Sequence, residues 1–364
     1  MHRQRGKTGS NRAVALYAIV GALALTAVLL YLIRIEAFGA ASKPNVTEHR
    51  TERSAWLADW RWEAGTEDLQ TSAGGLYSLQ VFAAYFDPAD KLKFTDEFRE
   101  SLPRIREIAS ENGLDRLYLT IVNDIVFPDG TESQKDTALV TRLTASGESR
   151  GRHIDEIVQA AVSYGFQGVE LDYEQIGKDD WPNFVRLVRE LHSRLLAEGL
   201  AFRVVFEPRA PLETLDLPEG PVYVMMAYNL HGGHSGPGPK ANDAFVAEQA
   251  SRMAKLSVDS YIALSAGGFD WHGKTGKAVS VTERQAAELA NRFGAEAVRD
   301  SSSGALRFEY EDEEGIGHEV WYADGTTFSQ WIRAAQKKGI HNIAIWRLDE
   351  LGRDTLAQLK GTSS

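Results

Sequence analysis

The chain has 364 residues, of which 40 are Lys or Arg and 51 are Asp or Glu, so its formal net charge is −11. This acidic balance argues against a nucleic-acid partner, because phosphate backbones attract basic surfaces. The absence of cysteine excludes disulfides, thiolate catalysis and thiolate zinc sites. The length suffices for two average domains or for one large α/β barrel with additions.

An uncharged apolar run occupies residues 13–33 and is long enough to cross a bilayer as a helix. Basic residues in the tail 1–12 precede it, so the positive-inside bias places this tail in the cytoplasm and everything after Arg34 outside. We therefore expect a single-pass membrane protein with an extracytoplasmic domain. A cleaved signal peptide is the alternative, because residues 39–41 are small. A buried helix of a soluble domain is a third interpretation.

Residues 34–53 are polar, show no clear period and predict a linker to a domain at 54–364. In that domain, strand-like and helix-like stretches alternate. The eight candidate strands are 54–60, 78–86, 116–123, 166–174, 202–207, 222–229, 260–268 and 341–347. The helical candidates between them are 96–111, 151–164, 181–197, 243–256 and 327–338.

Eight βα repeats predict an α/β fold of the (β/α)8 TIM barrel type. A doubly wound open sheet is the structural alternative, but the sequence has no Gly-x-Gly-x-x-Gly after an early strand. The stretch before the last strand holds a helical pattern at 282–293 and strand-like runs at 306–311 and 319–322. We expect a small α+β insertion there, at about 270–325, between strands seven and eight of the barrel.

The stretch 164–174 carries carboxylates at every second position, namely Glu170, Asp172 and Glu174. On a strand these three side chains share one face, while the apolar residues between them face away. An edge strand with a solvated polar face is one interpretation. The helical patterns on both sides favour the other, a parallel strand covered on both faces, with its acids in the barrel interior or at its mouth.

The carboxyl ends of the predicted strands carry further polar and aromatic residues, where the active site of such a barrel lies. These residues are Asn123, Asp124, Glu207, Tyr228, Asn229, Asp270, Trp271 and Trp346. Aromatic faces with a few acids suit sugar rings, although core packing is an alternative for each aromatic residue. His231 and His234 lie in a glycine-rich stretch and are better explained as loop residues than as metal ligands. We therefore expect no metal and no cofactor.

The motif Phe-Gln-Gly-Val-Glu-Leu-Asp-Tyr-Glu at 166–174 resembles the signature strand of glycoside hydrolase family 18, the chitinase-like barrels, which reads Asp-Gly-x-Asp-x-Asp-x-Glu. Gln167, Glu170, Asp172 and Glu174 occupy its four acidic positions. Four later segments resemble the family in the same order, and the one at 318–322 is similar to its bacterial wall- and spore-lytic branch. The segments are 225–229, 267–271, 318–322 and 345–348. Gln167, Glu170 and Asn229 depart from the family pattern.

The resemblance implies a retaining glycosidase that cuts β-linked N-acetylglucosamine polymers, either peptidoglycan or chitin-like, with help from the substrate's own acetamido group. It implies that Glu174 is the acid, that Asp172 orients the acetamido group and that Tyr228 donates a hydrogen bond to it. The implied substrate-binding residues are Glu170, Asn229, Trp346, Trp271 and Asp270. We expect a monomer held at the membrane by its N-terminal helix.

Two other functions remain open from the sequence. The departures at Gln167, Glu170 and Asn229 allow a catalytically silent barrel that only binds glycan. An envelope scaffold without sugar affinity is the other possibility.

Overall fold

The computed structural model describes residues 51–256 and 259–361. In this part of the chain, eight strands form a closed parallel barrel, in which each strand pairs with its two neighbours and β15 pairs with β1. In barrel order the strands are β1 (Arg53–Ala58), β2 (Ser78–Phe86), β4 (Leu117–Val126), β6 (Gly168–Asp172), β7 (Ala201–Phe206), β8 (Val222–Met226), β9 (Ser260–Ser265) and β15 (Asn342–Trp346). The predicted barrel is confirmed, and each predicted strand overlaps one of these eight.

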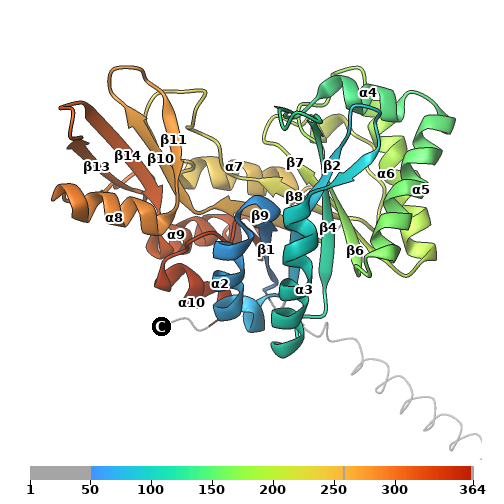
Figure 1. Ribbon diagram of the computed structural model, residues 1–364, viewed down its shortest axis with the longest axis horizontal. Coiled ribbons are helices and arrows are strands. Elements are labelled where there is room, and N and C mark those ends of the chain that lie inside the picture. Colours follow the sequence, from blue (N-terminus) through green and yellow to red (C-terminus); the bar gives the residue numbers. More distant parts are fainter. Residues whose placement is uncertain (1–50, 257–258, 362–364) are drawn as a thin grey trace, which may run out of the picture. The chain divides into compact units, whose positions relative to one another are not determined.

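Helices cover the outside of the barrel (Figure 1). They are α2 (Trp62–Ser72), α3 (Asp96–Glu111), α4 (Thr137–Thr144), α5 (Gly147–Ser163), α6 (Trp181–Ala197), α7 (Asp243–Met253), α9 (Gly325–Gln336) and α10 (Arg353–Lys360). The start of α3 shows why the chain turns helical there: the Thr95 hydroxyl accepts a hydrogen bond from the Phe98 amide, which caps the first turn. Between β7 and β8 the structure has only the short 3-10 turn η3 (Leu212–Thr214).

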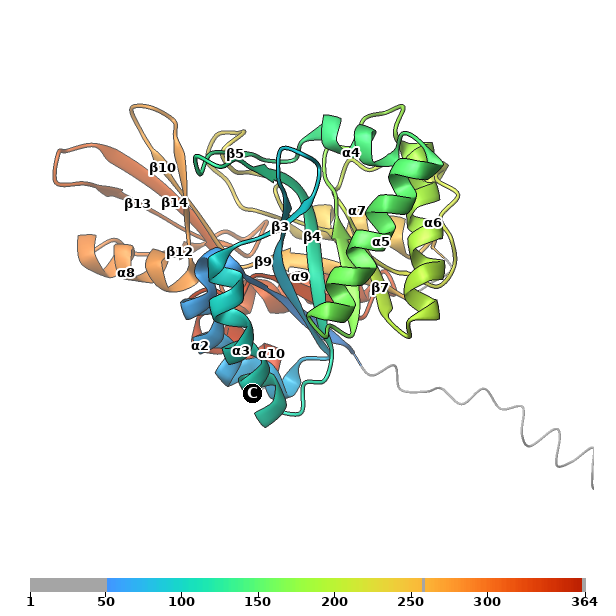
Figure 2. The same ribbon diagram turned by 45° about the vertical axis from the view of Figure 1, so that its right-hand side comes forward.

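A second, antiparallel sheet is inserted between β9 and α9. Its strands, in spatial order, are β11 (Ala278–Val281), β10 (Gly267–His272), β14 (Gly317–Ala323), β13 (Leu306–Glu311) and β12 (Val298–Arg299), and α8 (Glu283–Phe293) packs on it. A small apolar core, including Phe308, Val320 and Ala286, joins this sheet to its helix. Figures 1 and 2 show this unit on the side of the barrel away from α5 and α6.

Two short strands extend the barrel wall at its mouth. β3 (Leu92–Phe94) pairs antiparallel with the end of β2, and β5 (Glu132–Ser133) pairs antiparallel with the end of β4. Because β5 folds back over the carboxyl end of β4, the residues that follow it return to the mouth of the barrel. This small hairpin places Lys135 within reach of Glu174.

The tail 1–12, the apolar run 13–33 and most of the linker lie outside the described residues. Within 51–256 and 259–361, no helix combines the length and the apolar character needed to cross a bilayer. The membrane anchor therefore stays a prediction from the sequence.

Candidate active site

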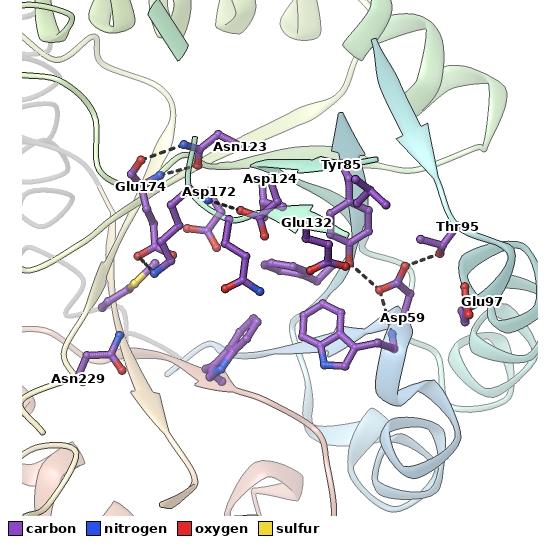
Figure 3. A pocket seen from close by; sticks show the side chains of 18 of the residues that line it. Asp59, Tyr85, Thr95, Glu97, Asn123, Asp124, Glu132, Asp172, Glu174 and Asn229 are labelled. Carbon is purple, nitrogen blue, oxygen red and sulfur yellow. Dashed lines mark hydrogen bonds and ion pairs between the residues drawn. The ribbon is translucent and has the colours of Figure 1, made fainter. Parts of the chain in front are cut away.

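A cavity of about 620 Å³ opens at the carboxyl ends of the barrel strands (Figure 3). Its walls combine aromatic rings, among them Trp60, Phe82 and Trp346, with several carboxylates. Figure 3 shows Glu174, Asp172 and Asn229 toward one end of this cavity and Asp59, Thr95 and Glu97 toward the other. We call it the mouth cavity.

Glu174 lies just beyond the end of β6, and its backbone is held in place by Asn123 of β4. The Glu174 amide donates to Asn123 Oδ1 at 2.9 Å, and Asn123 Nδ2 donates to the Glu174 carbonyl at 3.0 Å. The side chain is 16% exposed, and its Oε2 accepts a hydrogen bond from Lys135 Nζ at 2.5 Å. Burial raises the pKa of the Glu174 carboxyl, and the Lys135 ammonium partly offsets this rise.

Asp172, the last residue of β6, points into the same cavity and is 6% exposed. Its Oδ1 is buried and has no hydrogen-bond partner in the described part of the chain. Burial raises the pKa of Asp172 well above its ordinary value, and the charges of Glu174 and Glu170 raise it further. An unpartnered buried oxygen is unusual in a folded protein, and this one belongs to a residue that lines the cavity.

Glu170 is not at the cavity, contrary to its predicted substrate contact. It is completely buried inside the barrel, where its Oε1 accepts from Trp56 Nε1 at 2.6 Å and Thr120 Oγ1 at 2.9 Å. Its Oε2 accepts from Arg203 Nε at 2.8 Å. The parallel register of β6 and β7 sets Glu170 opposite Arg203, which explains the pairing. Glu170 therefore supports the strand that carries Asp172 and has no free oxygen for a ligand.

Three further residues with a predicted catalytic or substrate-binding role line the mouth cavity: Tyr228, Asn229 and Trp346. Tyr228 is 6% exposed. Burial raises its pKa well above its ordinary range, and the nearby carboxylates add to the rise, so its hydroxyl stays protonated and can donate. The indole of Trp346 is set edge-on against Phe82, with ring centroids 5.1 Å apart, which fixes its orientation.

Asp270 and Trp271 are not brought to the mouth cavity. They lie on β10 of the second sheet rather than at the end of a barrel strand. Asp270 accepts hydrogen bonds from the Tyr310 hydroxyl at 2.7 Å and pairs with His318 Nδ1 at 2.8 Å. Trp271 is 2% exposed and lines a separate hollow on that sheet. The prediction placed both at a strand end because it extended the barrel strand to residue 268 and began the insertion only at about residue 270, whereas β9 ends at Ser265 and β10 of the second sheet begins at Gly267.

Lys135 was not predicted as a site residue, because a single lysine in a loop has no distinctive sequence pattern. The same holds for Asp59, which lines the far end of the mouth cavity and accepts from the Tyr85 hydroxyl at 2.6 Å and from Thr95 Oγ1 at 2.5 Å. Burial raises the pKa of Asp59, although these hydrogen bonds lower it in part. Among the described residues, no cluster of three or more His, Cys, Asp or Glu side chains is placed to hold a metal ion.

The sequence model of the glycosyl hydrolases family 18 matches residues 132–350. A cortical fragment-lytic enzyme of Bacillus anthracis is 23% identical over 301 residues, which are 78% of this chain and 68% of that protein. The protein YdhD of Bacillus subtilis (strain 168) is 24% identical over 233 residues, or 58% of this chain, and the match spans only 54% of YdhD.

Solved structures share the fold. The spore cortex-lytic enzyme SleL of Bacillus cereus superposes with a TM-score of 0.72 at 20% identity, covering 86% of this chain and 74% of that one. A class V chitinase from Pseudomonas fluorescens Pf-5 superposes with the same TM-score of 0.72 at 17% identity, covering 86% of this chain and 99% of that one.

Proposed function

Because the chain belongs to glycosyl hydrolases family 18 and is a glycosidase, we propose that it cleaves β-linked N-acetylglucosamine polymers, either peptidoglycan or a chitin-like glycan, by a substrate-assisted retaining mechanism. The observation that carries the proposal is the unpartnered, buried Oδ1 of Asp172 beside Glu174 in the mouth cavity. The names of the relatives, a cortical fragment-lytic enzyme and a chitinase, support this substrate class.

In the proposed reaction, Glu174 donates its proton to the glycosidic oxygen as the bond from C1 to that oxygen breaks. The acetamido carbonyl oxygen of the same sugar attacks C1 and closes an oxazolinium ring. Water then adds at C1, gives its proton to the Glu174 carboxylate and reopens the ring. The anomeric configuration is retained because two successive displacements occur at C1 and each inverts its configuration.

The neighbouring residues act on the acetamido group. Asp172 accepts a hydrogen bond from the acetamido N–H and stabilises the positive charge that develops as the ring closes. The protonated Tyr228 hydroxyl donates a hydrogen bond to the acetamido oxygen. Trp346 gives the sugar ring an apolar floor. Asp172 and Glu174 titrate as an interacting set, so the reacting proton belongs to the pair.

We also propose that residues 13–33 anchor the protein in a membrane, with the glycosidase outside the cytoplasm. The uncharged apolar run and the basic tail support this arrangement.

The test uses Glu174→Gln, which keeps the size of the side chain but cannot donate the proton. N-acetylglucosamine oligomers and purified peptidoglycan are incubated with the wild type and the variant, and the products are identified by mass spectrometry and reducing-end assay. We expect the wild type to release reducing ends and the variant to release none while keeping its melting temperature. Unchanged turnover by the variant would remove Glu174 from its role, and wild-type binding without cleavage would overturn the proposed reaction.

The acetamido group gives a second test. An oligomer of free-amine glucosamine should not be cut, because it has no acetamido group. A stable thiazoline analogue of the oxazolinium intermediate should inhibit the enzyme, because it resembles the intermediate that the site stabilises. Cleavage of the amine oligomer at a comparable rate would refute assistance by the substrate.

A further inference from the structure

The ion pair between Lys135 and Glu174 lies where two cavities meet. On one side is the mouth cavity of about 620 Å³. On the other is a cavity of about 770 Å³ lined by Glu207, Arg209 and His234, among others, which we call the side cavity. Lys135, Glu174 and Asn229 line both. A chain of sugars that continues from one cavity into the other must therefore pass this pair.

Lys135 reaches Glu174 from a separate segment of the chain, the loop between β5 and α4. Its backbone has a φ of +54°, a left-handed conformation that lysine adopts rarely. The Lys135 amide donates to Asp124 Oδ1 at 2.7 Å, which holds this conformation in place. The backbone is thus fixed, whereas the side chain, 34% exposed, is a flexible four-carbon arm. The ammonium can swing away without any movement of the loop.

The charges around the pair favour its ionised form. Burial alone would lower the pKa of Lys135, but the carboxylates of Glu174, Asp172 and Glu207 raise it overall. Lys135 therefore stays charged. Glu174 in turn faces Lys135, Glu207 and Asp124, with Asp172 and Tyr228 close by. Among these groups Lys135 is the cation, and its charge favours the ionised form of Glu174, whereas the charges of Glu207 and Asp124 disfavour it.

The hydrogen bond from the Lys135 ammonium to Glu174 Oε2 at 2.5 Å favours the charged carboxylate over the protonated acid. The acid of the proposed reaction needs the opposite state, a protonated Glu174 aimed at the glycosidic oxygen. The paired form is therefore a resting form of the site.

We propose that Lys135 is a gate residue: its ammonium closes the passage between the two cavities by pairing with Glu174, and a glycan that spans both must displace it before Glu174 can act as the acid. This inference rests on the proposed role of Glu174. The ligand that opens the gate is an N-acetylglucosamine oligomer long enough to occupy both cavities, whereas a disaccharide can remain on one side.

The first experiment does not depend on activity. The carboxyl of Glu174 is titrated by carbon-13 NMR in the full-length protein, with its signal assigned from its loss in Glu174→Gln. We expect Lys135→Met to move the Glu174 titration to higher pH and Lys135→Arg to leave it nearly in place. Lys93→Met is the matched control, because Lys93 is a half-buried lysine of the same barrel end whose Nζ donates to the backbone carbonyl of Val126 at 3.3 Å.

The second experiment measures binding and rate. By calorimetry, Lys135→Met should bind the N-acetylglucosamine hexamer roughly twofold to fivefold more tightly than the wild type, because no ion pair has to be broken. Binding of the dimer should not change. The alkaline limb of kcat/KM should also move to higher pH in Lys135→Met, but not in Lys93→Met.

An unchanged Glu174 titration in Lys135→Met would overturn the gate, and so would an equal gain in affinity for dimer and hexamer. If Lys135→Met fails to fold, Lys135→Gln is measured in the same way. Absence of cleavage by the wild type overturns the proposed function and not the pairing, since the NMR titration and the hexamer binding are read without turnover. Absence of binding by every variant overturns both.

Discussion

The buried ion pair of Glu170 and Arg203 is expected to stabilise the barrel interior strongly, and Glu170→Gln tests this. The Glu170 side chain is 0% exposed and that of Arg203 is 2% exposed. The Glu170 carboxylate accepts hydrogen bonds from Trp56, Thr120 and Arg203. Arg203 Nη2 already has no hydrogen-bond partner among the described residues. Loss of the carboxylate charge leaves a buried guanidinium uncompensated, which destabilises a protein by about 3–5 kcal/mol. Such a loss is a large share of the roughly 5–15 kcal/mol of a typical domain.

The free energy of unfolding is measured by urea denaturation at pH 7, provided that the transition is two-state. The control is Glu190→Gln, because Glu190 also pairs with an arginine, Arg150, but its side chain is 43% exposed; we expect it to lose less than about 1 kcal/mol. Replacement of both Glu170 and Arg203 by Met should restore part of the loss, since no unpaired charge is left. A loss in Glu170→Gln no larger than that of the control would refute the reasoning.

Three further outcomes are expected. Asp172→Asn should lower kcat/KM on N-acetylated oligomers by about 10²–10³ without lowering the melting temperature, and a loss of less than threefold would count against its role. Trp346→Ala should weaken oligomer binding by about 2 kcal/mol in calorimetry, and unchanged affinity would exclude it as a floor. Burial lowers the pKa of His153 to about 3 from 6.5. Between pH 6.5 and pH 3 the unfolded chain therefore binds a proton that the native protein does not bind. The free energy of unfolding falls as the pH is lowered through this range. His153→Gln should flatten that loss, by at most about 1.4 kcal/mol per pH unit, and an unaltered acid limb in urea denaturation would contradict it.

The barrel could be predicted because its strands are covered on both faces and therefore appear as apolar runs between amphipathic helices. Two of the predicted helices, α3 and α6, match their predicted bounds. The helix α2 was missed because its buried face consists largely of small or polar residues, with Gly65, Asp68 and Ser72 among them, and leaves no apolar period. Small residues are required on this face because the neighbouring side chains lie close to the helix backbone. A Cβ atom on Gly65 would lie only 2.9 Å from Leu57 Cγ.

The site was predicted only in part. From the alternation of acids along β6, Asp172 was predicted to lie at the mouth of the barrel, where the structure has it. The alternation could not reveal which residue each acid pairs with. Arg203 becomes the partner of Glu170 through the register of β7 against β6, and Lys135 becomes the partner of Glu174 through a hairpin at the end of β4. Both pairings join segments more than 30 positions apart, so local patterns contain no trace of them.

These partners give three carboxylates of one short segment three different electrostatic states. Glu170 is neutralised inside the barrel by Arg203, Glu174 is paired at the mouth with Lys135, and Asp172 lies between them without a cation of its own. The raised pKa of Asp172 follows from that position, since burial and both flanking charges disfavour its ionised form. If a bound glycan displaces Lys135, the ammonium that favours a charged Glu174 leaves the cavity, and the proton affinity of the Asp172 and Glu174 pair rises. Substrate binding itself would then place the proton where the glycosidic oxygen needs it, while Glu170, fixed by Arg203, would stay unchanged.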